Sequence, residues 1–289
     1  MGKNAIILVD KAPGVTSFDC LGRIKRSVNK KTGHCGTLDK FAHGLIIALC
    51  GSYTRLVPAF MGMDKVYVAT LEFGKMTDTL DPEGQVIEKS EIPDFETIKK
   101  VVLSYVGPQN QVPPIYSAIH VNGKRSYQMA RSGTLELDLK PRQIRINNAE
   151  ILEWEPPFLK LRLDVSKGTY VRSYARDIGH MCASSAYVKE LYRTNIGPFD
   201  VKDAVVFNDV EALQKLGSGE NLLYKIPGVK EIELTKEEAF KVSNGYIMSS
   251  VLKKMPGDSV LIIMRCDSRV VCVYSVVEGR ILCQVRDES

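Results

Sequence analysis

Two stretches of alternating apolar and polar residues constrain the fold of this chain most. Residues 65–73 alternate, and residues 159–165 alternate without a break. A period of two is typical of a strand with one buried face. We therefore expect two half-buried strands, whose inward rows are Tyr67, Ala69, Leu71 and Phe73 in the first and Leu159, Leu161, Leu163 and Val165 in the second.

Helical spacing of apolar residues marks the segments around these strands. Residues 17–28 carry one apolar stripe, and Ser17 is the expected N-cap of that helix. Residues 171–181 predict a second helix, with Arg172 and Arg176 on its polar face. The expected buried stripes are Phe18, Leu21, Ile24 and Val28 in the first helix and Val171, Tyr174, Ile178 and Met181 in the second.

A glycine-punctuated loop at residues 33–44, reading GHCGTLDKFAHG, holds a carboxylate beside a histidine and cations. Its three glycines allow positive φ angles and a close approach of the backbone to a ligand. Asp39 in this setting suits covalent chemistry on a polyanion. A structural turn in which Asp39 caps the next helix is the simpler alternative.

Charge is distributed unevenly along the chain. Residues 1–60 contain nine Lys and Arg against three Asp, or +6, and the rest contains 30 against 31, or −1. A basic face of this kind suits phosphate contacts. The seven cysteines form no C-x-x-C pair and no zinc-like set, and the apolar stretch at residues 5–9 is too short for an export signal or a membrane span. We therefore expect reduced thiols, no bound metal and a cytoplasmic protein.

Six segments, in order, resemble the motifs of the TruB family of tRNA pseudouridine synthases. The loop at residues 33–44 is similar to the family's catalytic motif, G-H-x-G-T-L-D-P-x-A-x-G. The other five are DKAPGVTS at residues 10–17, KVY at 65–67, GKMTDTLDPEG at 74–84, PPIYSA at 113–118 with the residues up to Arg131, and SKGTYVR at 166–172. Together they cover residues 10 to about 199.

The resemblance implies an α+β fold, with a mixed and largely antiparallel central sheet flanked by helices, and the isomerisation of uridine 55 in the T loop of tRNA. It implies that Asp39 is the essential carboxylate, that Arg172 pairs with it, and that Tyr67 and Tyr170 line the uracil pocket. His34 would occupy the vacated stack, Leu191 would contact the base and Lys11 would organise the pocket. No cofactor, metal or protein partner is implied.

Several of these roles have structural alternatives. Leu191 is otherwise a core leucine on a helix expected from Ser185 to Arg193, and Lys11 is otherwise structural. Whether Asp39 attacks C1′, adds to C6 or removes the C2′ proton stays open. A non-catalytic RNA-binding protein or tRNA-folding chaperone, and a guide-RNA-dependent synthase, are the alternative functions.

The domain organisation follows from the same patterns. We expect a catalytic domain at residues 1–225, with a basic insertion at about 120–145 that resembles the family's thumb and supplies Lys124, Arg125, Arg131 and Arg142 to the RNA backbone. An ordinary solvated hairpin is the alternative there. Residues 205–216 suggest a short helix followed by a glycine hinge. Three apolar runs near the C-terminus predict a small β domain at residues 226–289, which by resemblance is PUA-like and meets the acceptor arm, or else is a structural cap.

Overall fold

The computed structural model describes residues 3–117, 120–121, 124–125, 139–206, 208–209 and 218–285. The chain divides into two compact units. Unit 1 comprises residues 1–39, 44–62 and 197–289, and unit 2 comprises residues 40–43 and 63–196. Along the chain, the first boundary between them falls directly after Asp39.

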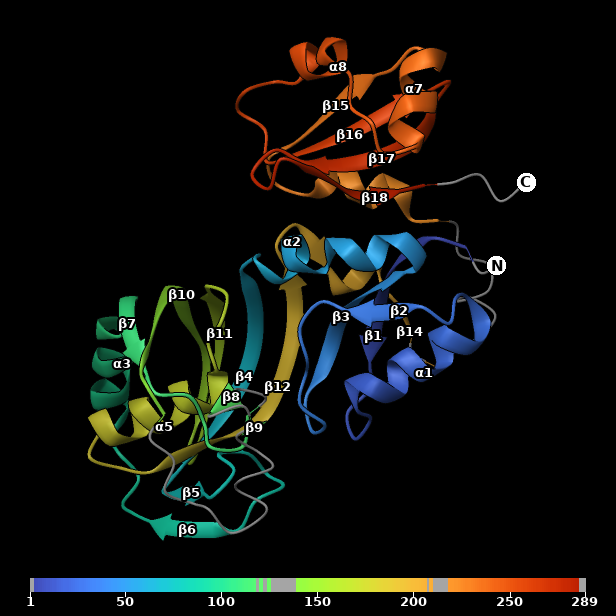
Figure 1. Ribbon diagram of the computed structural model, residues 1–289. Coiled ribbons are helices and arrows are strands. Elements are labelled where there is room, and N and C mark those ends of the chain that lie inside the picture. The colour runs from blue at the N-terminus through green and yellow to red at the C-terminus, as the bar shows by residue number, and fades with distance from the viewer. Residues whose placement is uncertain are drawn as a thin grey trace. The chain divides into compact units, whose positions relative to one another are not determined.

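Unit 1 contains the β14-β1-β3 end of a ten-stranded mixed sheet and a separate four-stranded C-terminal sheet (Figure 1). Its strands are β1 (Ala5–Lys11), β2 (Thr32–His34), β3 (His43–Cys50), β13 (Phe199–Asp200), β14 (Val205–Val206), β15 (Val229–Glu233), β16 (Leu261–Cys266), β17 (Arg269–Ser275) and β18 (Arg280–Gln284). Its helices are α1 (Ser17–Ser27), α2 (Val57–Met61), α7 (Lys236–Ser243) and α8 (Ser249–Lys254), with the 3₁₀ helices η1 (Gly51–Leu56), η2 (Val201–Asp203) and η3 (Glu220–Lys225).

Strand β1 is central to the first sheet of unit 1. It pairs antiparallel with β3 and parallel with β14. Residues 45–50 of β3 are completely buried, as are most residues of β1. Near-continuous apolar runs of this kind are typical of strands covered on both faces. The interior strands therefore give a rigid base to the loops at their ends.

The N-cap of helix α1 lies one residue earlier than expected. Thr16, not Ser17, is the N-cap, and it forms a capping box with Asp19. Ser17 is instead buried, and its hydroxyl both donates to the Leu38 carbonyl and accepts from the Leu38 amide, each at 3.0 Å. The expected stripe is wrong at Phe18, which is 71% exposed, while Leu21 and Ile24 are buried.

The C-terminal segment folds into the expected β structure. The strand order is β15-β16-β17-β18, with β15 parallel to β16 and the other pairs antiparallel. The three predicted apolar runs are the strands β16, β17 and β18. Helices α7 and α8 close the core, whose buried residues include Val242, Val251, Ile262, Met264 and Cys272.

Glu238 ties α7 to α8 and makes this part of the fold sensitive to acid. Its carboxylate accepts from Lys254 at 2.6 Å, from the Thr235 amide and from Ser250. These bonds, that of Lys254 foremost, lower the pKa of Glu238 from 4.5 to about 2. Because the folded pKa is depressed, the stabilisation is present above pH 4.5 and is lost as pH falls towards 2. The melting temperature of the wild type should exceed that of Glu238→Gln by several degrees at neutral pH, and this difference should vanish near pH 2. A constant difference would contradict this.

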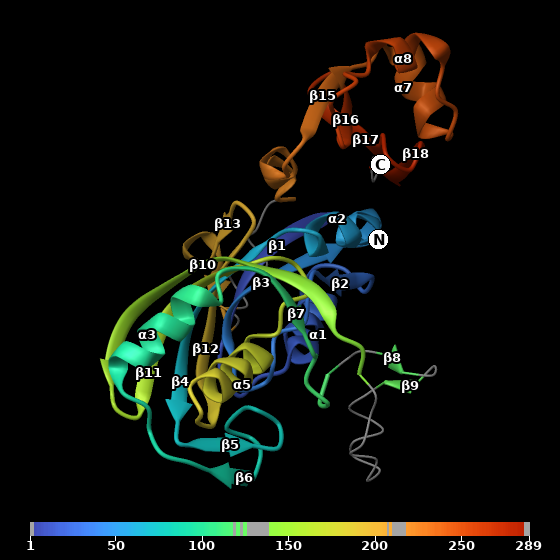
Figure 2. The ribbon, with the colours of Figure 1, turned by 90° about the vertical axis from the view of Figure 1, so that its left-hand side faces the viewer.

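Unit 2 is built on an antiparallel sheet in the order β12-β4-β11-β10-β7. Its strands are β4 (Lys65–Phe73), β5 (Lys75–Thr77), β6 (Val86–Lys89), β7 (Gly107–Gln111), β8 (His120–Val121), β9 (Lys124–Arg125), β10 (Arg142–Glu155), β11 (Phe158–Val165) and β12 (Ala186–Ile196). Its helices α3 (Phe95–Ser104) and α5 (Val171–Met181) lie on the same side of this sheet (Figure 2). The two alternating segments are the strands β4 and β11, as predicted, and the structure shows that these strands pair.

The prediction of a helix from Ser185 to Arg193 is wrong, because residues 186–193 belong to β12. Two bulges, between Val188 and Glu190 and between Arg193 and Asn195, interrupt its pairing with β4. Each bulge shifts the alternation by one residue. The strand therefore lacks the strict alternation that would predict it from the sequence.

Two other expected segments differ from the structure or lie partly outside it. The helix expected at residues 205–216 starts wrongly, since Val205–Val206 is the strand β14. Residues 210–217, with the first glycine of the expected hinge, are outside the described residues. Of the thumb, the described parts are the short hairpin of β8 and β9 and the residues from 139 onward. Arg131 lies outside them.

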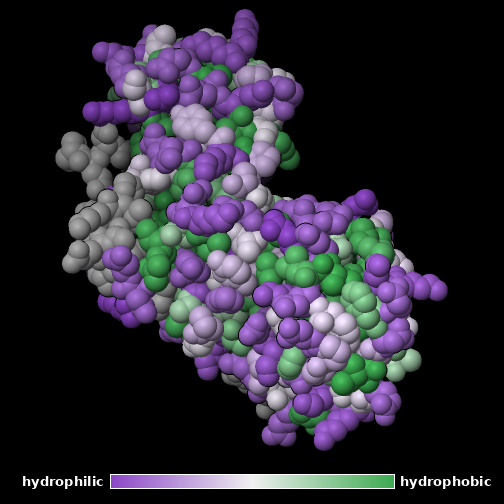
Figure 3. Space-filling view, turned by 180° about the vertical axis from the view of Figure 1, so that it is seen from behind, coloured by the Kyte–Doolittle hydropathy of each residue, from purple (hydrophilic) through white to green (hydrophobic). Residues whose placement is uncertain are grey.

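The surface of the described residues is mixed in character. Figure 3 shows one side of it to be mainly hydrophilic, with apolar side chains in small groups. Among the described helices, none has the length and apolar character needed to span a bilayer.

Candidate functional site

The segment that leads to Asp39 is anchored within unit 1. Before it, His34 ends β2, where its backbone pairs with Ala48 of β3. Gly36 has a φ of 94°, a conformation that side-chain-bearing residues rarely adopt. Leu38, held by Ser17, is buried, and Asp39 follows it in a half-buried position. The carboxylate is thus attached to a rigid backbone yet is partly accessible.

The side chain of Lys11 binds the backbone of the turn that follows it. Its side chain is fully buried, and its ammonium donates to the carbonyl oxygens of Val15 at 2.7 Å and Ala12 at 3.0 Å. These bonds shape the turn that leads into α1. Burying an ammonium costs free energy unless its donors are satisfied, and the two carbonyls accept from two of its three N–H groups.

Tyr67 and Leu191 lie on the same face of the sheet in unit 2. Leu191 of β12 pairs with Ala69 of β4, and Arg193 pairs with Tyr67. Residues directly opposite one another in an antiparallel pair share a face. Leu191 is 5% exposed, whereas Tyr67, at the end of the buried row, is half-buried. The sheet therefore places the phenol beyond the apolar core and next to the leucine.

Arg172 is buried, contrary to the expectation that it lies on a polar helix face. It sits in the first turn of α5 with its side chain 6% exposed. Its guanidinium donates to Asp81 at 3.2 Å, to the Thr79 carbonyl at 2.9 Å and to the Tyr116 carbonyl at 2.8 Å. These three acceptors hold the planar guanidinium in one position.

Asp81 is the residue of this cluster that sequence reasoning missed. Its second oxygen accepts from the Thr79 hydroxyl at 2.6 Å and from the Glu83 amide at 3.0 Å. It thereby joins Arg172 to the turn of the β5–β6 hairpin, in the segment GKMTDTLDPEG. The available signal was an aspartate within a turn motif, and that pattern alone did not indicate a buried ion pair.

Tyr170 is held by a second residue that the sequence did not reveal. The side chain of Gln111, which is 1% exposed, accepts from the Tyr170 amide at 2.8 Å and donates to the Tyr170 carbonyl at 3.1 Å. This two-bond clamp fixes the residue that precedes α5. Tyr170 itself is half-buried.

The predicted RNA-backbone cations are described only in part. Arg142 is exposed at the start of β10, where its backbone pairs with Gln111. Lys124 and Arg125 form β9. Strands β10 and β7 end the sheet order of unit 2. Residues of both strands, Arg145 of β10 among them, line a pocket of about 650 Å³ together with Lys167. This edge of unit 2 thus presents cations around a concave surface.

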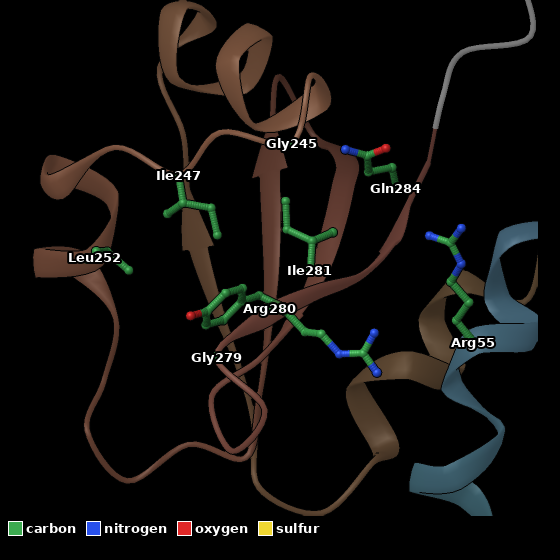
Figure 4. A pocket seen from close by; sticks show the side chains of 9 residues that line it. Arg55, Gly245, Ile247, Leu252, Gly279, Arg280, Ile281 and Gln284 are labelled. Atoms are coloured by element: carbon green, nitrogen blue, oxygen red, sulfur yellow. The ribbon is translucent and has the colours of Figure 1, made fainter.

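Unit 1 contains another cationic pocket, of about 540 Å³. Arg55 reaches it from η1 and Arg280 from the start of β18, and Tyr274 and Gln284 complete its polar lining (Figure 4). Both arginines also line an adjoining pocket of about 430 Å³. Arg280 is paired with Glu278 at 2.5 Å. None of the predicted catalytic residues lies in these two pockets.

A metal-binding set is absent from the residues described. Within these ranges, no group of three or more His, Cys, Asp or Glu side chains is placed to hold a metal ion. The predicted site residues comprise a carboxylate in unit 1 and two phenols, a guanidinium and a leucine in unit 2. Such groups can bind, orient and react with an organic substrate through acid–base or nucleophilic steps.

Comparison with known proteins identifies the family. The model of the TruB family pseudouridylate synthase (N terminal domain) matches residues 25–171. The tRNA pseudouridine synthase B of Endomicrobium trichonymphae is 41% identical over 216 residues, which are 74% of this chain and 94% of that protein. The tRNA pseudouridine synthase B of Borreliella afzelii (strain PKo) is 36% identical over 275 residues, covering 92% and 96% of the two chains.

Solved structures support the fold. A chain in a crystal structure of a Cbf5-Nop10-Gar1 complex superposes with a TM-score of 0.67 at 23% identity, covering 98% of this chain and 84% of that one. A chain in a structure of an H/ACA RNP bound to a substrate RNA superposes with a TM-score of 0.68 at 20% identity, covering 98% of this chain and 86% of that one. This likeness confirms the expected α+β pseudouridine synthase fold with a PUA-like C-terminal sheet. By its family match and its relatives, this chain belongs to the TruB family and is a pseudouridine synthase.

Proposed function

We propose that this enzyme converts uridine 55 in the T loop of tRNA to pseudouridine, with Asp39 as the essential carboxylate. The observation that carries the proposal is the rigid, half-buried attachment of Asp39 within a loop that matches the family's catalytic motif. The relatives named tRNA pseudouridine synthase B, which this chain matches over most of its length, support tRNA as the substrate.

The reaction breaks the N-glycosidic bond, turns the uracil and joins C5 to C1′. It is redox-neutral, so its electrons balance without an oxidant or reductant. Asp39 acts as nucleophile or base on the extruded nucleoside. Tyr67 and Tyr170 line the uracil pocket, and Leu191 contacts the base from the neighbouring strand position. Tyr67 and Leu191 share one face of the sheet, which supports a common pocket.

Arg172 acts on Asp39 through charge in this proposal. Its guanidinium is already fixed by Asp81 and by the carbonyls of Thr79 and Tyr116, so it needs little reorganisation when substrate binds. Lys11 contributes by holding the turn before α1, because its ammonium is occupied by two backbone carbonyls.

Binding elsewhere must offset the cost of extruding the target base, a few kcal/mol. His34 takes the vacated position in the stack. Lys124, Arg125, Arg131 and Arg142 contact the RNA backbone from the thumb, where each neutralised phosphate releases counterions. We further propose that the enzyme works in the cytoplasm without a protein partner or guide RNA.

The test is a site-resolved assay on unmodified tRNA transcripts. The purified enzyme should release tritium from 5-tritiated uridine to the extent of one uridine per tRNA, and a transcript with cytidine at position 55 should release none. Release from the cytidine transcript would contradict the position. No release from either transcript, with RNA still bound, would favour the non-catalytic alternative.

The C-terminal domain, residues 226–289, is proposed to contact the acceptor arm through the pocket of Arg55 and Arg280. Two guanidinium groups around one concavity suit a phosphate. Arg55 has no carboxylate partner among the described residues, so its charge is available to a ligand.

Arg55→Ala should therefore weaken binding of full-length tRNA while leaving an isolated T stem-loop unaffected. Loss of one phosphate contact should reduce affinity about tenfold and lower the slope of log Kd against log salt by about 1. Filter binding at several salt concentrations measures both. Lys253→Ala, a cation of α8 outside the pocket, is the control. Equal weakening for the two RNAs would refute the assignment to the acceptor arm.

A further inference from the structure

Helix α1 exposes an aromatic ring that the core does not use. Phe18 is 71% exposed although its spacing with Leu21 and Ile24 predicts burial. Apolar side chains scattered singly on a surface are ordinary. This one differs because of what surrounds it and where its helix is anchored.

Cations share the exposed face with Phe18. The Lys25 ammonium lies 5.3 Å from the ring centroid, a cation–π distance. Arg26, the next residue after Lys25, is exposed, and a Cβ placed on Gly22 would meet only the Arg26 guanidinium, at 3.7 Å. Positions four and seven or eight apart lie on one helix face. Phe18, Gly22, Lys25 and Arg26 therefore form a flat cationic surface around one ring, which we call the α1 platform.

The platform is anchored to the segment that carries Asp39. Ser17, the residue before Phe18, bonds the amide and the carbonyl of Leu38, the residue before Asp39. Both anchoring residues are at most 4% exposed. Ser17 and Leu38 thus form one buried hydrogen-bonded pair. Phe18 directly follows Ser17 in the chain, and Asp39 directly follows Leu38.

The local acid, Asp19, offsets only part of the charge of Lys25 and Arg26. Asp19, the acidic residue of the first turn, accepts from the Thr16 amide and hydroxyl and so belongs to the helix cap. In the part of the chain that the structure describes, neither Lys25 nor Arg26 has a carboxylate partner. The net character of the face is positive and aromatic.

We propose that the α1 platform binds an unpaired nucleotide of the substrate RNA beside the extruded uridine, with the base stacked on Phe18 and its phosphate held by Lys25 and Arg26. This extends the proposed function and rests on it for the identity of the RNA. An aromatic face with adjacent cations is the common means of holding single-stranded RNA. A protein partner would favour a wider apolar patch than one ring.

Substitution at Phe18 gives the first test. Phe18→Ala should weaken binding of the T stem-loop about tenfold, the effect of losing one stacked base. Phe240→Ala is the matched control, because Phe240 of α7 is also 71% exposed. Phe18→Trp should restore affinity, whereas Phe18→Leu should not, because leucine keeps the apolar volume but has no π face. Equal affinities for Phe18→Ala and Phe240→Ala, or rescue by leucine, would overturn the proposal.

Fluorescence gives a direct readout of stacking. The chain contains one tryptophan, so wild type supplies the background signal for Phe18→Trp. RNA should quench the added fluorescence of Phe18→Trp and leave that of Phe240→Trp unchanged. No quenching at saturating RNA would overturn the proposal. Sedimentation shows whether the protein associates with itself in the absence of RNA. Self-association that is lost in Phe18→Ala would assign the α1 platform to contact with a second copy of the chain instead.

Abasic T stem-loops identify the nucleotide. At one loop position, removing the base should abolish the difference in RNA affinity between wild type and Phe18→Ala, as in a double-mutant cycle. Additive effects at every position would contradict stacking. If wild type makes no pseudouridine but Phe18→Trp is quenched, the proposed function fails and the platform stands. If wild type is active and Phe18→Ala behaves like its control, only the platform fails.

Discussion

Asp39→Asn should bind T-loop RNA as tightly as wild type and release tritium from 5-tritiated uridine at least about 1,000-fold more slowly. The amide has the shape of the carboxylate, so the loop held by Ser17 and Leu38 should not change. It lacks the negative charge, and it can neither attack carbon nor accept a proton at neutral pH. Single-turnover release and filter binding on the same preparation separate the two effects.

The control for this variant is Asp258→Asn, which removes an exposed carboxylate from the C-terminal segment. It should match wild type in both assays. Mass spectrometry should verify that residue 39 has not deamidated, since a small fraction of aspartate would restore activity. Turnover near the wild-type rate by verified Asp39→Asn would remove Asp39 from the chemistry.

Much of the fold could be predicted from local pattern. The strands β4 and β11 and the C-terminal strands β16 to β18 follow directly from apolar periodicity, because each lies with one side against a core. Helix α5 was predicted with the correct bounds, although Met181 is 51% exposed. Regular elements with an uninterrupted period are the ones that sequence alone predicts.

The errors have identifiable physical causes. The helix prediction fails at β12 because its two bulges break the alternation that is typical of a strand. The burial prediction fails at Phe18 because its spacing fits the buried stripe of α1, and spacing does not show where a stripe ends. A residue that violates its local pattern is a candidate for function, and this is the basis of the α1 platform.

The surroundings of the candidate site depend on contacts between distant segments. The burial of Arg172 arises from Asp81 and Thr79, which are about ninety residues away in the chain. The clamp of Gln111 on Tyr170 spans 59 residues. No local period encodes such contacts. Family resemblance could therefore assign Arg172 and Tyr170 a role, whereas only the folded structure shows what holds them.

Asp81→Asn should lower both the stability of the enzyme and its turnover. The Asp81–Arg172 pair is buried, with side chains 7% and 6% exposed, so removing its negative charge should cost about 3 kcal/mol of unfolding free energy. The guanidinium keeps its carbonyl acceptors but loses the charge that fixes it. A displacement of that group should reduce kcat about 10- to 100-fold, while KM changes little.

The hairpin offers a matched control, because Asp78→Asn lies in the same turn. Asp78 accepts from the Gln85 amide at 2.9 Å and is more exposed than Asp81. It should retain kcat and lose less stability. Urea unfolding measures stability, and single-turnover assays well below each melting temperature measure chemistry on folded protein. If Asp81→Asn is less stable yet has the wild-type kcat, the aspartate supports the fold alone. A fall in kcat that is absent in Asp78→Asn makes Asp81 a positioning residue, acting on the reaction through Arg172.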